Sequence, residues 1–444
     1  MTYKRTHFVK DGDDWIVFFC DTVTYKRINK KEKECYDFIM AGKSKEAYDS
    51  VSMDTEADFF DKCLNELRAD GKKAVQLPEE KIRLTLNVAN ACNMNCGYCY
   101  ANGGTYHSHE QLMPLDVAKK AIDIFAEQYG EIGSIKFIGG EPLLNKDVVC
   151  ALCDYVYEKF GNGVIPYMPD FIIATNGTIL DDEIIAYSIK YNWRVGLSFD
   201  GPEMIHDIVR RFRNGETTVS VIKDNIKKWK QATGGKCPSS VNGCYSGIHQ
   251  QHEVTVTDAV KYMKEELGIN KVNIVPVDAS KDSSFGLVDN GCFVSAIKEI
   301  LDKSSDDYRK FIFTKLRKLE KVLRSHHSMS EHICKAGLTT FGISTTGVIS
   351  PCHMLTDENG FYMGTVEEDN VFESHDFLSV QKDLKAYNRY DSEKCGSCFA
   401  NRLCIGCLGG NLFRTGDPYQ SDPVVCSMIK GAVEELLKDI TRNE

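Results

Sequence analysis

Cysteine is the residue type best able to do chemistry in this chain, and three cysteines form a tight group. Cys92, Cys96 and Cys99 have the spacing Cys-x3-Cys-x2-Cys. Structural zinc sites have four ligands, and the nearest further candidates, His107 and His109, fall in a segment without a helix or strand pattern. An iron–sulfur cube that only transfers electrons also takes four thiolates. Three thiolates would therefore leave one iron of a cube open to chelation by the amino and carboxylate groups of a small molecule.

A second group of cysteines lies near the C-terminus at short spacings. Its members are Cys334, Cys352, Cys395, Cys398, Cys404, Cys407 and Cys426. Two closely spaced pairs can build a four-cysteine zinc site, but seven cysteines exceed one such site. The others have no matching partners, which is typical of small buried side chains: Cys20, Cys35, Cys63, Cys150, Cys153, Cys237, Cys244 and Cys292. With 18 cysteines and no signal-peptide pattern, the chain favours metal or redox chemistry over disulfides.

Three polar or glycine-rich motifs follow the first cysteine group. They are Gly139-Gly140-Glu141-Pro142, Thr175-Asn176-Gly177 and Ser198-Phe199-Asp200-Gly201. Glycines let a strand end approach a ligand closely, so that exposed backbone groups or Glu141 can receive an ammonium group. Ser198 and Asp200 offer a hydroxyl and a carboxylate suited to ribose hydroxyls, although these residue types also cap helices.

The elements between these motifs alternate between strand and helix patterns. Six β-rich runs are predicted, at Arg83 to Val88, Ser134 to Ile138, Phe171 to Thr175, Arg194 to Phe199, Ser240 to Tyr245 and Val272 to Val277. Helical patterns separate them, for example at 114–128 and 258–267. This alternation predicts parallel strands with right-handed crossovers, which is an α/β fold of the partial (β/α)6 TIM-barrel type. Because chemistry in such folds lies at the C-terminal strand ends, the motifs are expected to converge there.

The N-terminal residues form a separate pattern of strands followed by helices. An apolar run at 15–20 and a β-prone stretch at 23–28 precede helical patterns that end near Gly42 and Gly71. This predicts a small α+β unit, either a recognition domain or a structural extension. The formal net charge of −10 argues against nucleic acid as a partner. Without an apolar run of membrane-spanning length, we expect no membrane association and a cytoplasmic location.

The motif CNMNCGYC at 92–99, together with GGEP at 139–142 and SFDGP at 198–202, resembles the radical S-adenosylmethionine (SAM) superfamily. The resemblance implies that Cys92, Cys96 and Cys99 hold a catalytic 4Fe-4S cluster whose fourth iron binds SAM. It further implies SAM contacts from Tyr98 beside the adenine, from Arg210 at the carboxylate, and from Gly139, Gly140, Glu141, Pro142, Asn176, Ser198 and Asp200. For Arg210 a solvated helix face is the alternative, and the adjacent Arg211 leaves the register open.

The C-terminal cysteines resemble the SPASM extension of this superfamily, which carries two auxiliary 4Fe-4S clusters and would bring the total to three. The resemblance implies that Cys334, Cys352 and Cys407 serve the first auxiliary cluster. It assigns the second to Cys395, Cys398, Cys404 and Cys426. In the run of four cysteines from Cys395 to Cys407, the last spacing, between Cys404 and Cys407, is one residue shorter than usual. Some relatives have an extra cysteine shortly before the first of the seven, whereas here the nearest upstream cysteine is Cys292. The first cluster therefore either lacks a protein ligand or takes one such as His332.

The resemblance predicts a peptide-modifying enzyme with four parts. They are a winged-helix, leader-recognition-like domain (1–77), a partial barrel (78–285), a helical bridge (286–333) and a cysteine-rich iron–sulfur domain (334–444). The expected reaction joins a cysteine sulfur to a carbon in a ribosomally made precursor peptide with an N-terminal leader, as in sactipeptide or ranthipeptide synthases. Flavodoxin or ferredoxin would supply electrons. We expect the N-terminal unit to serve peptide capture more than cluster chemistry.

Three alternatives remain for the function. A sulfatase-maturating enzyme has an Asp directly after the second auxiliary-cluster cysteine, where this chain has His353 after Cys352. Another SPASM enzyme would form a carbon–carbon cross-link. A non-catalytic zinc or electron-transfer protein would leave the GGEP motif unexplained.

Overall fold

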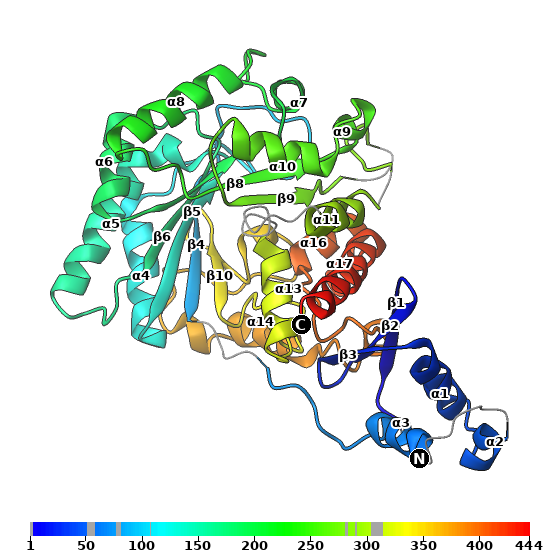
Figure 1. The fold of residues 1–444 in the computed structure, drawn as a ribbon. Coiled ribbons are helices and arrows are strands. Elements are labelled where there is room, and N and C mark those ends of the chain that lie inside the picture. Colours follow the sequence, from blue (N-terminus) through cyan, green and yellow to red (C-terminus); the bar gives the residue numbers. More distant parts are fainter. Residues whose placement is uncertain are drawn as a thin grey trace.

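The computed structural model describes residues 3–50, 58–76, 81–106, 108–279, 283–288, 291–302 and 314–444. Its main feature is an eight-stranded sheet in the order β11-β10-β4-β5-β6-β7-β8-β9 (Figure 1). The six strands from β4 to β9 are parallel. They are β4 (Ile82–Ala89), β5 (Ile132–Gly139), β6 (Asp170–Thr175), β7 (Arg194–Ser198), β8 (Ser240–Tyr245) and β9 (Val272–Pro276). The α/β fold with six parallel strands expected from the sequence is confirmed.

Helices cover the outer face of this curved sheet (Figure 1). They are α4 (Leu115–Tyr129), α5 (Lys146–Gly161), α6 (Asp182–Lys190), α7 (Glu203–Val209), α8 (Val219–Ala232), α9 (Gly247–Gln251) and α10 (Val256–Glu265). Each longer helix buries one apolar stripe, as α4 does with Ala118, Ile122 and Phe125. Since the strands are buried on both faces, they contain nearly continuous apolar runs.

The C-terminal part adds two strands that the sequence did not predict. β10 (Thr340–Ile343) pairs with β4 in parallel, and β11 (Ile349–Ser350) pairs with β10 antiparallel. Strands this short show no readable alternation, which explains why the sequence gave no signal for them. The cysteine-rich segment therefore extends the barrel sheet itself.

The remaining C-terminal elements pack below and beside the barrel (Figure 1). They are α11 (Cys292–Asp302), α13 (Thr314–Arg324), α14 (His375–Ala386), α15 (Glu393–Gly396), α16 (Leu408–Thr415) and α17 (Pro423–Arg442). Among the described residues, no helix has the length and apolar character needed to cross a membrane. The predicted boundary between residues 77 and 78 lies outside the described residues.

The N-terminal unit is a three-stranded antiparallel sheet with helices on one face. Its elements are β1 (Thr6–Asp11), β2 (Asp14–Phe19), β3 (Thr24–Ile28), α1 (Lys30–Met40), α2 (Lys45–Asp49) and α3 (Phe59–Leu67). α1 begins with a capping box in which Asn29 and Glu32 satisfy each other's backbone N–H groups. The sequence missed β1, which ends in the charged residues Lys10 and Asp11, and the short α2.

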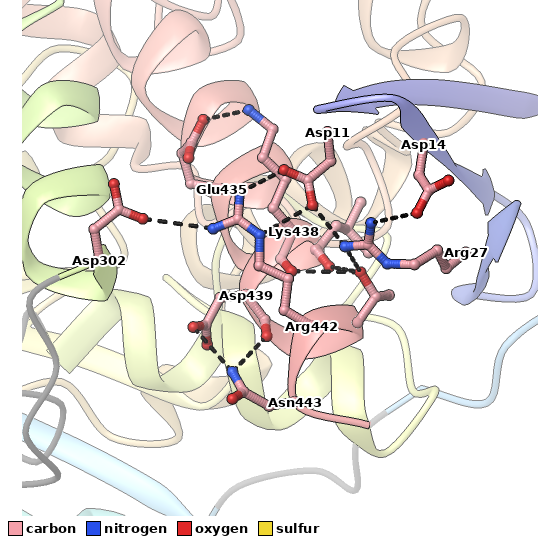
Figure 2. Close-up of polar contacts among 11 residues, drawn as sticks. Asp11, Asp14, Arg27, Asp302, Glu435, Lys438, Asp439, Arg442 and Asn443 are labelled. Carbon is pink, nitrogen blue, oxygen red and sulfur yellow. Dashed lines mark hydrogen bonds and ion pairs between the residues drawn. The ribbon is translucent and has the colours of Figure 1, made fainter. Parts of the chain in front are cut away.

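Both faces of this small sheet are buried. One face packs against α1 and α3 through Val17 and Phe19, whereas Ile16 and Phe18 on the other face belong to the core of the main body. Figure 2 shows Asp11 of β1 between Arg27 of β3 and Arg442 of α17, with a 2.5 Å contact between Arg27 Nη2 and Asp11 Oδ2. The unit is therefore packed into the main body and is more than an appended recognition domain.

Candidate active site

A cavity of about 280 Å³ lies at the C-terminal ends of the parallel strands. Among its lining residues are nine of the predicted site residues: Cys92, Cys96, Tyr98, Cys99, Gly139, Gly140, Asn176, Ser198 and Arg210. They come from the loops or strand ends after β4, β5, β6 and β7, and from the C-terminus of α7. Glu141, Pro142 and Asp200 were also expected there but are not among the lining residues, because each is buried in the surrounding protein.

The three cysteines after β4 are partly buried at the mouth of this cavity. Burial raises the pKa of Cys92 to about 12 and that of Cys96 to about 11. Thiolates in such a place need positive charge nearby, and coordinated metal supplies it. The amide of Asn176 lies 3.9 Å from the Cys92 sulfur and 2.8 Å from Asn93 Oδ1, which ties the third motif to the cysteine loop.

The arrangement of thiols distinguishes between kinds of metal centre. Within the described part of the chain, no three His, Cys, Asp or Glu side chains converge closely enough to hold one metal ion. A zinc ion needs its ligands within about 2.0–2.3 Å of a single point. Each thiolate of a cube binds a different iron, so the thiolates need not meet at one point. The three cysteines therefore fit a cluster better than a single ion, and His107, one proposed zinc ligand, lies outside the described residues.

Asp200 lies beside the cysteine loop and contacts it through Tyr98. Its Oδ2 accepts a 2.8 Å hydrogen bond from Arg210 Nε and another from the Tyr98 hydroxyl. Its Oδ1 accepts a 2.9 Å bond from the backbone N–H of Cys244. Burial opposes ionisation, but the Arg210 charge and the nearby His206 hold the pKa of Asp200 below its usual value. Asp200 thus orients Tyr98 and Arg210, where the sequence suggested a direct contact with ribose.

The structure resolves which of two adjacent arginines faces the cavity. Arg210 is only 8% exposed and lies 5.4 Å from the centre of the Tyr98 ring. Arg211 is exposed, and its Nε donates a 2.6 Å hydrogen bond to the backbone oxygen of Asp207. The solvated-face alternative therefore applies to Arg211.

The glycines of the GGEP motif are required by close backbone contact. A Cβ at Gly139 would lie 2.4 Å from the Ala89 oxygen, and one at Gly140 would lie 2.4 Å from the Ala91 oxygen. Glu141 turns inward: its carboxylate accepts hydrogen bonds from Thr175 Oγ1 and from Asn176 N, both at 2.7 Å. Burial raises the pKa of Glu141 to about 7. The carboxylate holds the β5 and β6 ends together, so only backbone groups of this motif face the cavity.

Five titratable residues lining the cavity were not predicted as site residues from the sequence: Tyr100, Lys136, Cys244, Asp278 and His353. Lys136 stands in the middle of the apolar strand IGSIKFIG, and a lone lysine in a strand buried on both faces was the available signal. His353 was noted only as a departure from another enzyme class. Burial and the Lys136 charge lower the pKa of His353 to about 3, so its imidazole is neutral at pH 7.

Comparison with known proteins decides the family of this central part. Residues 86–275, which run from within β4 to within β9, match the Radical SAM superfamily. Residues 86–275 form a radical SAM domain. The cavity at its strand ends is therefore the expected place for SAM and a 4Fe-4S cluster.

The curated relatives of the chain include a radical SAM cyclopropyl synthase. The chain is 23% identical over 386 residues to the radical SAM cyclopropyl synthase TigE of Paramaledivibacter caminithermalis, covering 82% of this chain and 75% of TigE. The chain matches about half of the length of each of three further curated relatives, namely 46%, 46% and 54% of the relative's own chain.

Two solved structures share the fold around the radical SAM domain. The structure of anSMEcpe with bound AdoMet has a TM-score of 0.66 and 18% identity, covering 82% of this chain and 96% of that one. Streptococcus suis SuiB bound to precursor peptide SuiA has a TM-score of 0.52 and 15% identity, covering 95% of this chain and 99% of that one. At these identities the likeness establishes the fold.

Beyond the radical SAM domain, the C-terminal cysteines fall into two spatial sets. The charges of Cys334 and Cys407 raise the pKa of Cys352. The charges of Cys426, Cys395 and Cys398 raise the pKa of Cys404. Both sets are partly buried. Despite the shortened spacing, Cys407 therefore has Cys334 and Cys352 as its neighbours.

His332, the suggested fourth ligand near Cys334, is engaged elsewhere. Its Nδ1 lies 3.1 Å from the backbone oxygen of Tyr387. Its Nε2 lies 3.8 Å from Glu331 Oε1. The ring is thus held by contacts outside the set of Cys334, Cys352 and Cys407.

We expect Asp200→Ala to weaken SAM binding by the radical SAM domain at least about tenfold. The variant removes the carboxylate that orients Tyr98 and Arg210, and it leaves the Arg210 guanidinium buried without compensation. Equilibrium dialysis of SAM against the reconstituted protein measures the effect. Asp116→Ala, at an exposed position of α4, is the matched control. Unchanged SAM affinity in folded Asp200→Ala protein would contradict this positioning role.

Proposed function

We propose that the chain is a radical SAM peptide maturase that joins a cysteine sulfur to a carbon in a ribosomally made precursor peptide. The observation that carries this proposal is the composition of the cavity wall. Cys92, Cys96 and Cys99 line one part of it, and His353, directly after Cys352, lines another. A substrate side chain in the cavity would lie between the SAM site and the first C-terminal cysteine set.

The residues of the cavity suit SAM and its cluster. Cys92, Cys96 and Cys99 would hold the cluster, the Tyr98 ring would lie beside the adenine, and Arg210 would face the SAM carboxylate. Backbone groups of Gly139 and Gly140, with Asn176 and Ser198, complete the polar wall. When bound, the cluster and SAM supply a 5′-deoxyadenosyl radical that removes a hydrogen atom from a substrate carbon. The surrounding buried side chains keep water away from that carbon.

The C-terminal cysteines would hold two auxiliary 4Fe-4S clusters, giving three in total. In the proposed reaction a C–H and an S–H bond are broken and a C–S bond forms. The hydrogen atom leaves with 5′-deoxyadenosine, the thiol proton goes to solvent, and one electron must be accepted. Cys334, Cys352 and Cys407 would hold the acceptor, with the fourth position open to the substrate thiolate because His332 is held elsewhere.

The N-terminal unit would bind the leader of the precursor, with residues 1–77 as the recognition domain. β1 and β3 are the two edge strands of its sheet, and a leader can add to such an edge as a further strand. The fold likeness to SuiB bound to SuiA supports this, since 95% coverage must include most of this unit. We further propose residues 78–285 as the radical SAM part, 286–333 as a bridge and 334–444 as a SPASM domain, with flavodoxin or ferredoxin as electron donor.

The test is anaerobic turnover of a cysteine-containing precursor peptide with SAM and a reductant. We expect 5′-deoxyadenosine and a peptide lighter by two hydrogen atoms whose cysteine no longer reacts with iodoacetamide. A product of the same mass with a reactive thiol would indicate a carbon–carbon link. Conversion of cysteine to an aldehyde would indicate formylglycine formation. A protein that binds no iron and does not cleave SAM would support the non-catalytic zinc protein instead.

A further inference from the structure

Lys136 places a positive charge deep in the cavity of the radical SAM domain. It lies on β5 three residues before Gly139, which puts it about 10 Å below the strand end at ~3.3 Å per residue. In the sheet it is paired with Thr85 of β4 and Ile172 of β6, so its backbone is fixed on both sides. Its side chain lines the same cavity as the cysteine loop and His353.

The other charged side chains in the cavity wall have ion-pair partners in the protein. Arg210 pairs with Asp200 at 2.8 Å, and Asp278 shares Arg414, at 2.5 Å, with Asp422, at 3.1 Å. The side chain of Lys136 makes no hydrogen bond or ion pair with any described residue; burial and Arg83 lower its pKa, and Cys352 opposes this. Burial without a partner disfavours an ammonium ion. Lys136 is therefore a buried amine whose charged form an anionic group of a bound molecule would stabilise.

A second hydrogen-bonding side chain lines the same cavity. The imidazole of His353 is among the lining residues and makes no hydrogen bond with the described part of the chain. An ammonium and an imidazole N–H can donate to the two oxygens of one carboxylate. Amides of Asn242 and Asn273 add further polar groups to the same wall.

We propose that Lys136 and His353 form a subsite for a carboxylate side chain of the peptide substrate, an Asp or Glu near the reacting residue. This inference rests on the proposed peptide-maturase function and names its substrate class. The backbone of Lys136 lies about 10 Å below the glycine pair expected to contact SAM, at ~3.3 Å per residue. The peptide would thus be selected by an acidic residue that enters the barrel.

The test uses two synthetic tripeptide amides with an acetylated N-terminus, Gly-Asp-Gly and Gly-Asn-Gly, titrated calorimetrically into reconstituted protein with SAM bound. We expect the Asp peptide to bind about tenfold more tightly than the Asn peptide. Lys136→Gln should remove this difference by weakening only the Asp peptide. Lys236→Gln, at an exposed position after α8, is the matched control and should leave both affinities unchanged.

Three outcomes would overturn the proposal. One is equal affinity of wild-type protein for the two peptides. Another is a Lys136→Gln variant that still discriminates between them. The third is a variant that loses SAM affinity while the peptide difference persists, which would assign Lys136 to the cofactor. Because this is a binding experiment, discrimination without any peptide turnover would leave the subsite standing and would count against the maturase function alone.

Discussion

Replacing Cys92, Cys96 and Cys99 together by alanine should abolish cleavage of SAM to 5′-deoxyadenosine. The variant removes all three thiols at the mouth of the cavity, and with them the proposed ligands of the SAM-binding cluster. Iron content after anaerobic reconstitution should fall from about twelve to about eight atoms per chain, because three four-iron cubes would become two. Iron analysis and chromatography of the nucleoside product measure both effects.

The control for this variant is a pair of cysteines in α5. Cys150 and Cys153 are buried in the helix packed outside the sheet, so Cys150→Ala with Cys153→Ala should keep the full iron content and SAM cleavage. Retained cleavage in the triple variant would exclude these three cysteines from the catalytic cluster.

Deletion of the N-terminal unit should remove the proposed second auxiliary cluster as well as the proposed peptide capture. Arg5 of this unit donates hydrogen bonds to the backbone oxygens of Gly396 and Cys398, and a 2.9 Å bond to Asn401 Oδ1. These residues belong to the loop that carries Cys395 and Cys398. His7 also stacks on Phe399 with ring centres 3.6 Å apart. The sequence had suggested that this unit matters little for the clusters, and the contacts argue otherwise.

A point variant tests the same idea in a chain that keeps its whole core. We expect Arg5→Ala to lower iron content from about twelve to about eight atoms, because the loop of Cys395 and Cys398 loses its anchor. Arg68→Ala, at an exposed position of the same unit, is the control. If Arg5→Ala protein retained full iron content and the auxiliary-cluster spectrum, the contacts of Arg5 with the loop of Cys395 and Cys398 would not be needed to hold the cluster.

Much of the barrel was predictable because its strands are long and apolar. The run Ser240–Tyr245 has the same bounds in sequence and structure, and the capped helices lie within a few residues of their predicted places. Local sequence patterns did not predict the short strands β10 and β11. They also did not predict β1, which ends in charged residues. Pairing of β10 with β4 is a long-range contact that no local pattern records.

The site was only partly visible in the sequence, since a motif names a residue but not its partner. The structure brings Cys92, Gly139, Asn176 and Ser198 to one cavity. Tyr98 and Arg210 both donate hydrogen bonds to the Asp200 carboxylate. The spacing of these residues in the sequence does not predict that they meet. The lone lysine in an apolar strand was a signal for Lys136, but the sequence does not show which face of the sheet it occupies.

The pairing of β10 with β4 also has a consequence for folding during synthesis. One edge of β4 is covered by β5 soon after both emerge, but its other partner follows roughly 250 residues later. At ~5–20 residues per second, this edge waits about 10–50 s for its neighbour. An uncovered parallel strand with an apolar sequence is a template for wrong pairing. The nascent barrel is therefore most exposed to aggregation just before the cysteine-rich segment leaves the ribosome.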